Sequence, residues 1–300
     1  MTAEKPAPEA ADDYTPRLPG FSPGFTVDLR QVDDRYWASR TPMGISMTSV
    51  APLSAVDPKF MASEHRWVVR LLGGFQFWWK GSLQVGIPRA SQRLLAFLAL
   101  NGGVVSRATV SGTLWPDATE RHAYANLRSA LARLGRICRQ ALHANKLELG
   151  LAEGVMVDLR QAQMLARRLL DPAATHVGPE LGTAAAVTLS ADLLPGWYDE
   201  WALTDAEEWR LLRLHALEAL ARWLTAAGRW GEAAAAAAAA VRAEPLRQSA
   251  HDALIQVHLA EGNQSEAVRE FERYRTLLNA ELGLEPTQRL HRLIQDVQNR

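Results

Sequence analysis

The chain has 300 residues, of which 48% are hydrophobic and 22% are charged, a composition typical of a soluble protein long enough for two domains. Its single cysteine, Cys138, excludes a disulfide framework, and no apolar run approaches the roughly 20 residues of a membrane span. Residues 1–20 also lack the apolar core of a signal peptide, so we expect a cytoplasmic protein in which Cys138 is a small core residue.

Charge is unevenly distributed along the chain, although the formal net charge is zero. Residues 66–146 contain twelve Lys or Arg but only two acids, Asp117 and Glu120. Residues 1–65 contain six basic and nine acidic residues, and residues 159–300 contain fifteen and nineteen. A basic segment between mildly acidic ones is typical of phosphate binding confined to one part of a chain.

Residues 1–65 hold eight of the fifteen prolines and show no sustained periodicity. This pattern predicts a disordered or loosely ordered N-terminal extension. Short apolar islands, such as Tyr36-Trp37 and residues 43–50, leave open that part of it docks on a folded domain or on a partner.

Residues 67–103 have the pattern of a small sheet followed by a helix. Apolar and polar residues alternate in 67–80 and again in 83–87, with Lys80-Gly81 between them, which predicts a β-hairpin. Ser91 is expected to cap the helix that follows, and the helix ends at Asn101-Gly102-Gly103.

Residues 104–140 predict a short strand and two helices. The strand covers 104–105, and Ser106 caps a helix that closes at Trp115-Pro116. A longer helix is expected from Thr119 to Gln140, because apolar residues recur on one stripe at about 100° per residue. That stripe consists of Ala123, Leu127, Ala130, Leu131, Leu134 and Cys138. The other side carries Arg121, His122, Asn126, Ser129, Arg133 and Arg136, with Arg128 and Arg139 on the flank.

The polar side of the 119–140 helix has the residue types that read DNA. Arginine pairs bidentately with guanine, asparagine pairs with adenine, and serine contacts phosphate or base. An arginine-rich helical face can also be merely solvated, and the helix alone does not separate these two interpretations. The elements expected on either side of this helix favour DNA binding.

Residues 146–158 predict a second hairpin, in which Leu147, Leu149 and Leu151 alternate before a turn at Glu153-Gly154. A helix-turn-helix followed by a hairpin wing is a winged helix, and its third helix enters the major groove. We therefore assign residues 66–158 to a winged-helix DNA-binding domain. The residues expected to bind DNA are Arg89, Arg107, Arg121, His122, Asn126, Arg128, Ser129, Arg133, Arg136 and Lys146.

Residues 159–300 contain an internal repeat. Ala226–Ala233 and Ala260–Ala267 match in Ala, Gly, Glu and Ala at a spacing of 34 residues, the period of tetratricopeptide helix pairs. Helices are expected near 158–170, 203–227, 229–243, 247–261, 263–282 and 286–298. Packing between repeats is the expected role of five tryptophans, with a ligand cage as the alternative. They are Trp197, Trp201, Trp209, Trp223 and Trp230. The fold class is thus mainly α with a small β component, a winged helix-turn-helix followed by an all-α tetratricopeptide-like domain.

Motifs for catalysis are not found in the sequence. It lacks the glycine-rich phosphate loop that ends in Gly-Lys-Ser/Thr, and its histidines show neither H-E-x-x-H spacing nor cysteine partners. The sequence therefore predicts no enzyme activity, no cofactor and no metal.

Five motifs in residues 70–134 and three in the C-terminal half resemble those of the Streptomyces antibiotic regulatory protein family. The first set is Arg70–Phe75, Gln92–Ala96, Val105–Arg107, Leu114–Asp117 and Ala125–Leu134. The second is Leu193–Asp199, Ala243–Arg247 and Glu281–Pro286. The resemblance covers residues 66–298 and implies an OmpR-like winged helix joined to a bacterial transcriptional activation domain. Wings of this type usually offer a basic residue to the minor groove. This hairpin carries Glu148 and Glu153 and has only Lys146 at its base, so minor-groove contact is left open.

The resemblance also implies partners. Two copies are expected to bind promoter direct repeats in tandem, and the turn before the third helix, residues 116–120, is expected to contact the sigma and α subunits of RNA polymerase. Asp117 and Glu120 are the expected contacts; the alternative is that they only cap the helix and complement its dipole.

The predicted function is a sequence-specific activator of an antibiotic or other secondary-metabolite gene cluster, in a bacterial cytoplasm and associated with the nucleoid. A repressor with the same DNA contacts is one alternative. Another is an interaction scaffold whose basic segment binds protein or RNA.

Overall fold

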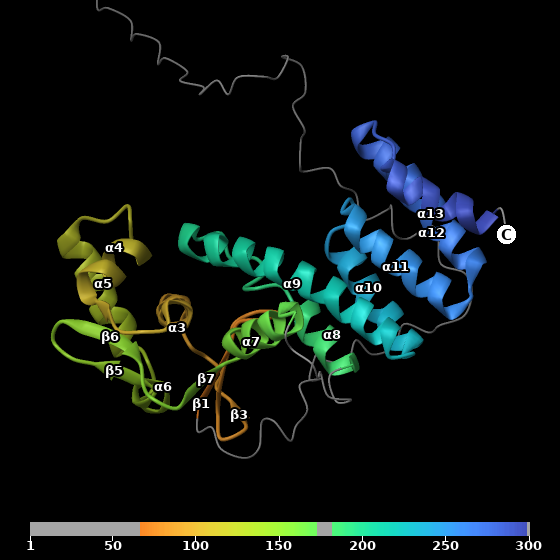
Figure 1. Ribbon diagram of the computed structural model, residues 1–300. Coiled ribbons are helices and arrows are strands. Elements are labelled where there is room, and N and C mark those ends of the chain that lie inside the picture. Colours follow the sequence, from red (N-terminus) through yellow and green to blue (C-terminus); the bar gives the residue numbers. More distant parts are fainter. Residues whose placement is uncertain (1–66, 173–181, 299–300) are drawn as a thin grey trace, which may run out of the picture. The chain divides into compact units, whose positions relative to one another are not determined.

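The computed structural model describes residues 67–172 and 182–298 (Figure 1). The prediction made for residues 1–65 lies outside the described residues. The fold is mainly helical with two small sheets, as expected from the sequence. Among the helices of the described ranges, none combines the length and the hydropathy that a membrane crossing requires.

The first sheet has four strands in the order β3-β2-β1-β7. Its strands are β1 (Trp67–Arg70), β2 (Gln76–Trp79), β3 (Ser82–Leu83) and β7 (Val155–Val157). Val69 of β1 is fully buried. In the register of the sheet it pairs with Phe77 of β2 on one side and with Val157 of β7 on the other. Lys80 and Gly81 both have positive φ, 46° and 76°, which is the backbone of a tight hairpin turn and confirms the turn predicted there.

Three helices follow the sheet: α3 (Arg89–Asn101), α4 (Arg107–Leu114) and α5 (Glu120–Ala132). Ser106 caps α4 as expected, because its Oγ accepts a hydrogen bond from Thr109 N at 3.0 Å. The cap predicted for Ser91 is wrong, since α3 begins two residues earlier, after Pro88. Ser91 is instead fully buried, and its Oγ donates to the Ala130 carbonyl at 2.8 Å, which ties α3 to α5.

The single helix predicted for residues 119–140 is also wrong. It is interrupted at residues 133–135, and a short helix, α6 (Arg136–Gln140), follows. The Arg139 guanidinium donates to the carbonyls of Leu131, Ala132 and Leu134 at 3.3, 3.0 and 3.2 Å, so it satisfies the free end of α5. Leu134 and Cys138 remain buried, which means that the apolar stripe survives the break.

The wing lies earlier in the chain than predicted. It is the antiparallel pair β5 (Leu142–Ala144) and β6 (Glu148–Leu151), and β4 (Val105–Ser106) pairs with the other edge of β6. Val155 and Val157 alternate as expected, but they lie in β7, which leaves the wing to pair in parallel with β1. Lys146 is therefore at the tip of the wing, not at its base.

Seven helices follow in the described residues, and six of them begin and end within three residues of prediction. They are α7 (Asp158–Leu170), α8 (Gly182–Ser190), α9 (Glu200–Ala226), α10 (Trp230–Ala243), α11 (Gln248–Glu261), α12 (Gln264–Leu282) and α13 (Gln288–Gln298). Helix α8 was not predicted. The alanine run of α10 buries Ala233, Ala236, Ala237 and Ala240 completely, and α10 packs on both α9 and α11 (Figure 1).

One apolar core extends from Val69 in β1 to Val257 in α11 and so joins the winged helix to the helical region. The backbone continues this junction: Gly73 N donates to Asp192 O at 2.8 Å, and Leu194 N donates to Leu71 O at 2.9 Å. Trp197 and Trp201 pack here, against Phe75 and Phe97 with ring centroids 6.2 and 5.5 Å apart. Trp197 and Trp201 therefore pack in the core, but they do so at the junction with the winged helix, whereas packing between repeats was expected.

Candidate nucleic-acid interface

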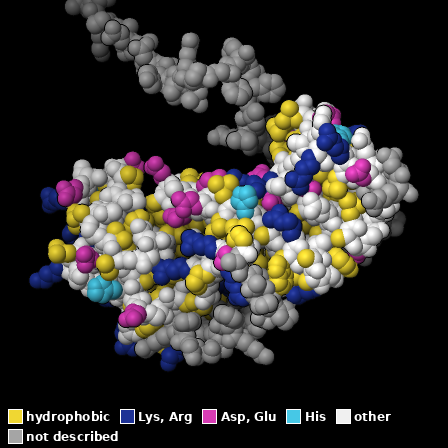
Figure 2. Space-filling model, viewed as in Figure 1, with side chains coloured by type: hydrophobic (Ala, Val, Ile, Leu, Met, Phe, Trp, Pro, Cys, Tyr) yellow, Lys and Arg dark blue, Asp and Glu magenta, His cyan; other side chains and the backbone are white. Residues whose placement is uncertain are grey.

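Helix α5 is held on the fold by one face and presents the other to solvent. Ala123, Leu127 and Ala130 are buried against the core, which fixes the rotation of the helix. The opposite face brings together the predicted side chains of this helix. Arg121, His122, Asn126 and Arg128 are exposed and Ser129 is half-buried; Arg133, the residue directly after α5, is also exposed. Basic side chains are visible at the left and lower rim of this part of the molecule in Figure 2.

The basic side chains of α5 are not neutralised by neighbours. Within the described residues, Arg121, Arg128 and Arg133 form no ion pair with a carboxylate. The arginines that do form such pairs in these residues are all others. Their charge is available to an external anion. Arg136 was expected on the same helix, but the structure places it in α6, past the break, where it is exposed.

The wing tip is a rigid turn held by its neighbours. Asn145 Oδ1 accepts from Leu147 N and Glu148 N at 2.8 and 2.7 Å. Arg107, the first residue of α4, donates from Nε to Asn145 O at 2.9 Å and from its backbone N to Leu147 O at 2.8 Å. Two predicted residues, Arg107 and Lys146, are thereby brought to one place. Sequence reasoning missed Leu147, which is 76% exposed at the tip.

Arg89, the remaining predicted residue, is engaged at the junction. The carbon of its guanidinium lies 3.7 Å from the centroid of the Trp197 ring, a cation–π contact. This contact was not foreseeable, because the two residues are far apart in the sequence and nothing local relates them.

The turn between α4 and α5 carries the two acids that were expected to meet the polymerase. Asp117 and Glu120 are both exposed. The residue that precedes α5 is Thr119, and neither acid occupies that capping position. Glu120 lies in the first turn of α5, where its charge complements the helix dipole.

Arg93 fixes the start of this turn and was not identified from the sequence. Its Nη2 atom donates to the carbonyl of Leu114, the last residue of α4, at 2.7 Å, and to Asp199 Oδ1 at 2.5 Å. Asp199 directly precedes α9. The end of α4 and the start of α9 are thus held by one guanidinium.

Two buried groups have shifted pKa values. Burial raises the pKa of the Cys138 thiol, which stays protonated in the core, the role that was predicted for it. Burial also raises the pKa of Asp158 to about 6, although the backbone N–H groups of Leu71, Leu72 and Leu159 donate to its carboxylate. Asp158 thereby joins the end of β1 to the start of α7.

A winged helix-turn-helix joined to stacked helices is the architecture of a DNA-binding transcription regulator. The comparisons agree. The family model described as bacterial transcriptional activator domain matches residues 144–298. The chain is 27% identical over 233 residues to regulatory protein AfsR of Streptomyces griseus, covering 73% of this chain and 23% of that protein. For regulatory protein AfsR of Streptomyces coelicolor, the identity is 27% over 240 residues, with coverage of 76% and 24%.

The chain spans about a quarter of the length of these relatives. Among solved structures, Mycobacterium tuberculosis EmbR in complex with a low affinity phosphopeptide matches with a TM-score of 0.56 and 22% identity. That match covers 79% of this chain and 66% of EmbR and supports the fold. The chain belongs to the bacterial transcriptional activator domain family. The similarity to the two AfsR proteins agrees with the resemblance of its motifs to the Streptomyces antibiotic regulatory protein family.

Proposed function

We propose that this activator binds duplex DNA in a sequence-specific way at promoters of a secondary-metabolite gene cluster, such as one for an antibiotic. The observation that carries the proposal is the exposed face of α5 and its C-terminal end, where Arg121, Arg128 and Arg133 lie without carboxylate partners among the described residues. Arginine and asparagine side chains on one groove-facing helix are suited to guanine and adenine edges. The choice of pathway rests on the resemblance of the sequence motifs to the Streptomyces antibiotic regulatory protein family.

The wing and the start of α4 supply the phosphate contacts in this proposal. Lys146 is exposed at the wing tip, and Arg107 lies half-buried beside it. Contacts of this kind orient a protein on DNA and make its affinity depend on salt, because each neutralised phosphate releases counterions.

Two copies bind promoter direct repeats in tandem in this proposal. The sequence has no coiled-coil heptad pattern that would enforce a two-fold dimer, and head-to-tail copies on one face of the duplex need sites about 10 to 11 base pairs apart. Recruitment of RNA polymerase follows through the turn that contains Asp117 and Glu120. Phosphate repels these carboxylates, so the turn points away from the duplex, toward basic surfaces of the sigma or α subunits.

Genome-wide mapping of sites bound by the full chain tests the function. The proposal expects sites at promoters of one biosynthetic cluster, each with a direct repeat. Insertion of about half a helical turn between the repeats should abolish joint binding. An inverted repeat at the bound sites would contradict the tandem arrangement, and binding without sequence preference would contradict the function itself.

A further inference from the structure

A cleft of about 840 Å³ lies between the turn that precedes α5 and the start of α9. Arg93 and residues 112–118 form the wall that belongs to the winged helix, and residues 198–201 with Thr204 form the wall that belongs to the helical region. Its size is in the range of clefts that hold a few side chains or a small ligand. None of the predicted DNA-binding residues lines it.

The walls of this cleft are acidic and aromatic. Asp117, Asp199 and Glu200 line it, and Arg93 is the one cation among the lining residues. Because Arg93 is paired with Asp199, the carboxylates of Asp117 and Glu200 remain as uncompensated charge. Trp115, Tyr198 and Trp201 add ring faces, and Tyr198 is 85% exposed. Carboxylates beside aromatic rings bind guanidinium and ammonium groups, through charge-assisted hydrogen bonds and cation–π contacts.

Duplex DNA does not fit this cleft, because its phosphates would meet two uncompensated carboxylates. The acidic surface continues past the cleft, where acidic side chains gather over the first half of α9 in Figure 2. Asp205, Glu207 and Glu208 lie in that part of α9. Asp117 belongs both to the cleft and to the turn, so the cleft is continuous with the surface assigned above to the polymerase.

We propose that the cleft receives a basic segment of the RNA polymerase holoenzyme, with an arginine or lysine side chain between Asp117, Tyr198 and Glu200. This inference rests on the proposed recruitment of polymerase, and it adds the start of α9 to the contact. The winged helix and the helical region then both contact the polymerase. Arg93 fixes the two walls of the cleft relative to each other, because it binds both Leu114 O and Asp199.

The test uses the full chain with the double substitution Tyr198→Ala, Glu200→Gln, which changes the α9 wall and leaves the turn and α5 intact. Glu281→Gln is the control, because Glu281 is an exposed glutamate of the helical region, in α12, and does not line the cleft. Thermal stability, promoter binding and transcription in vitro with purified RNA polymerase holoenzyme are measured. Transcription should fall about fivefold or more in the cleft variant, the scale of one lost charge-assisted contact, while binding and stability stay unchanged. The control should match the unsubstituted chain.

The substitutions Asp117→Asn and Glu120→Gln in the turn separate the two proposals. If the turn variant loses transcription and the cleft variant does not, the inference is overturned and recruitment through the turn stands. If both variants transcribe normally while bound to DNA, recruitment itself fails. A photo-crosslinking residue at position 198, in promoter complexes, gives a second readout that does not depend on the double variant folding. An adduct with a polymerase subunit supports the inference; an adduct with a second copy of this chain, or none, overturns it.

Discussion

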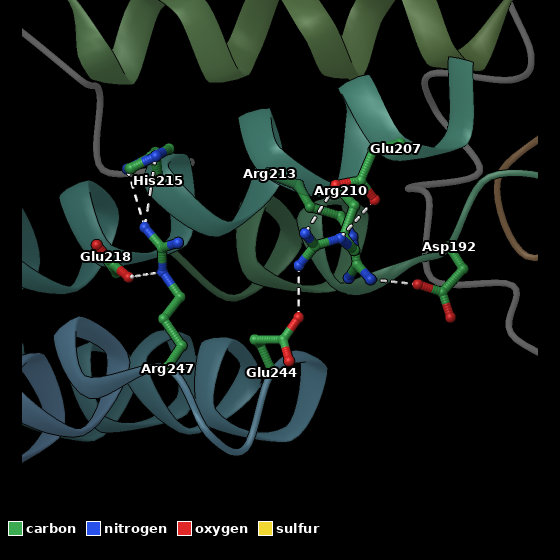
Figure 3. Close-up of polar contacts among 8 residues, drawn as sticks. All are labelled: Asp192, Glu207, Arg210, Arg213, His215, Glu218, Glu244 and Arg247. Carbon is green, nitrogen blue, oxygen red and sulfur yellow. Dashed lines mark hydrogen bonds and ion pairs between the residues drawn. The ribbon is translucent and has the colours of Figure 1, made fainter. Parts of the chain in front are cut away.

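The arginines of the helical region and those of α5 are in opposite chemical situations. In the helical region, eight arginines of the described residues pair with carboxylates. Figure 3 shows three of them: Arg210 reaches Glu207 and Glu244, Arg213 reaches Asp192, and Arg247 reaches Glu218 and lies against His215. On α5, Arg121, Arg128 and Arg133 have no such partner.

This difference separates arginines that pair with carboxylates inside the helical region from arginines whose charge is available to an external anion, in a chain of zero net charge. Internal pairing fixes helix against helix and removes charge from the surface of the helical region. Arg213 is the extreme case: its side chain is 5% exposed, and burial lowers its pKa while Asp192 opposes that effect. A side chain that already has a partner gains little from phosphate, whereas an unpartnered one on a helix face gains a new charge-assisted contact.

The largest effect is expected at Arg213. Arg213→Ala removes a buried guanidinium that also donates to Ser190 O at 3.0 Å, and so frees the segment that pairs with the strand region of the winged helix. Unfolding free energy should fall by about 3 kcal/mol, from the lost hydrogen bonds of a charged group and the lost packing of its buried stem, while Asp192, 65% exposed, is left solvated. Urea denaturation of the full chain measures it. Arg269→Ala, at an ion pair whose arginine is 64% exposed, is the control and should cost less than about 0.5 kcal/mol. Equal losses for the two variants would contradict the distinction within the helical region.

A slightly smaller effect is expected at Asp158, which joins the two regions. Its pKa is raised by burial from 3.8 to about 6, so the folded chain binds more protons than the unfolded chain between these values. The stabilisation from this group is complete below pH 3.8 and is lost as the pH rises through 6, by about 3 kcal/mol at most. Unfolding free energies measured from pH 4 to 7 for the unsubstituted chain and for Asp158→Asn should differ by a term that declines with pH. Parallel profiles would show that this carboxyl does not titrate as stated.

The smallest effect is expected at the turn, in transcription rather than in folding. Asp117→Asn with Glu120→Gln should lower activated transcription several-fold and leave promoter binding unchanged, because in the proposed complex the acids face away from the duplex. Stability should fall by about 0.5 kcal/mol at most, from the lost interaction of Glu120 with the dipole of α5. Transcription in vitro and thermal unfolding, both measured for the double variant and the unsubstituted chain, test this prediction. Lost folding would leave the dipole role of these acids as the sufficient explanation, and unchanged transcription would remove the turn from the mechanism.

Local patterns in the sequence predicted most of the fold. The 34-residue repeat placed the helices from α9 onward, and the apolar stripe of residues 123–138 identified the buried side of the recognition helix. The wing was misplaced because the alternation of Val155 and Val157 specifies a strand but not its partner. That partner is β1, more than eighty residues earlier. Likewise, the break after Ala132 depends on Arg139, whose guanidinium caps α5 from the next helix.

The candidate DNA-binding residues were predictable for the same reason. Those on α5 share one helix face, and a face follows from spacing alone. Arg89 and Arg93 depend on contacts with Trp197 and Asp199, which lie more than a hundred residues away in the sequence. No local pattern relates them, so the cleft and the junction became visible only in the structure.

The most direct test of the central claim is the affinity of the full chain for its mapped promoter duplex and for a scrambled duplex, by fluorescence anisotropy at several salt concentrations. Arg128→Ala and Arg133→Ala are compared with Arg269→Ala, which removes an arginine that has a carboxylate partner. We expect the two α5 variants each to lose about 1 to 3 kcal/mol of binding free energy on the promoter, with less discrimination against the scrambled duplex, and affinity to fall steeply with salt. Arg269→Ala should bind as the unsubstituted chain does. Equal affinity for both duplexes, or α5 variants that bind like Arg269→Ala, would contradict the account.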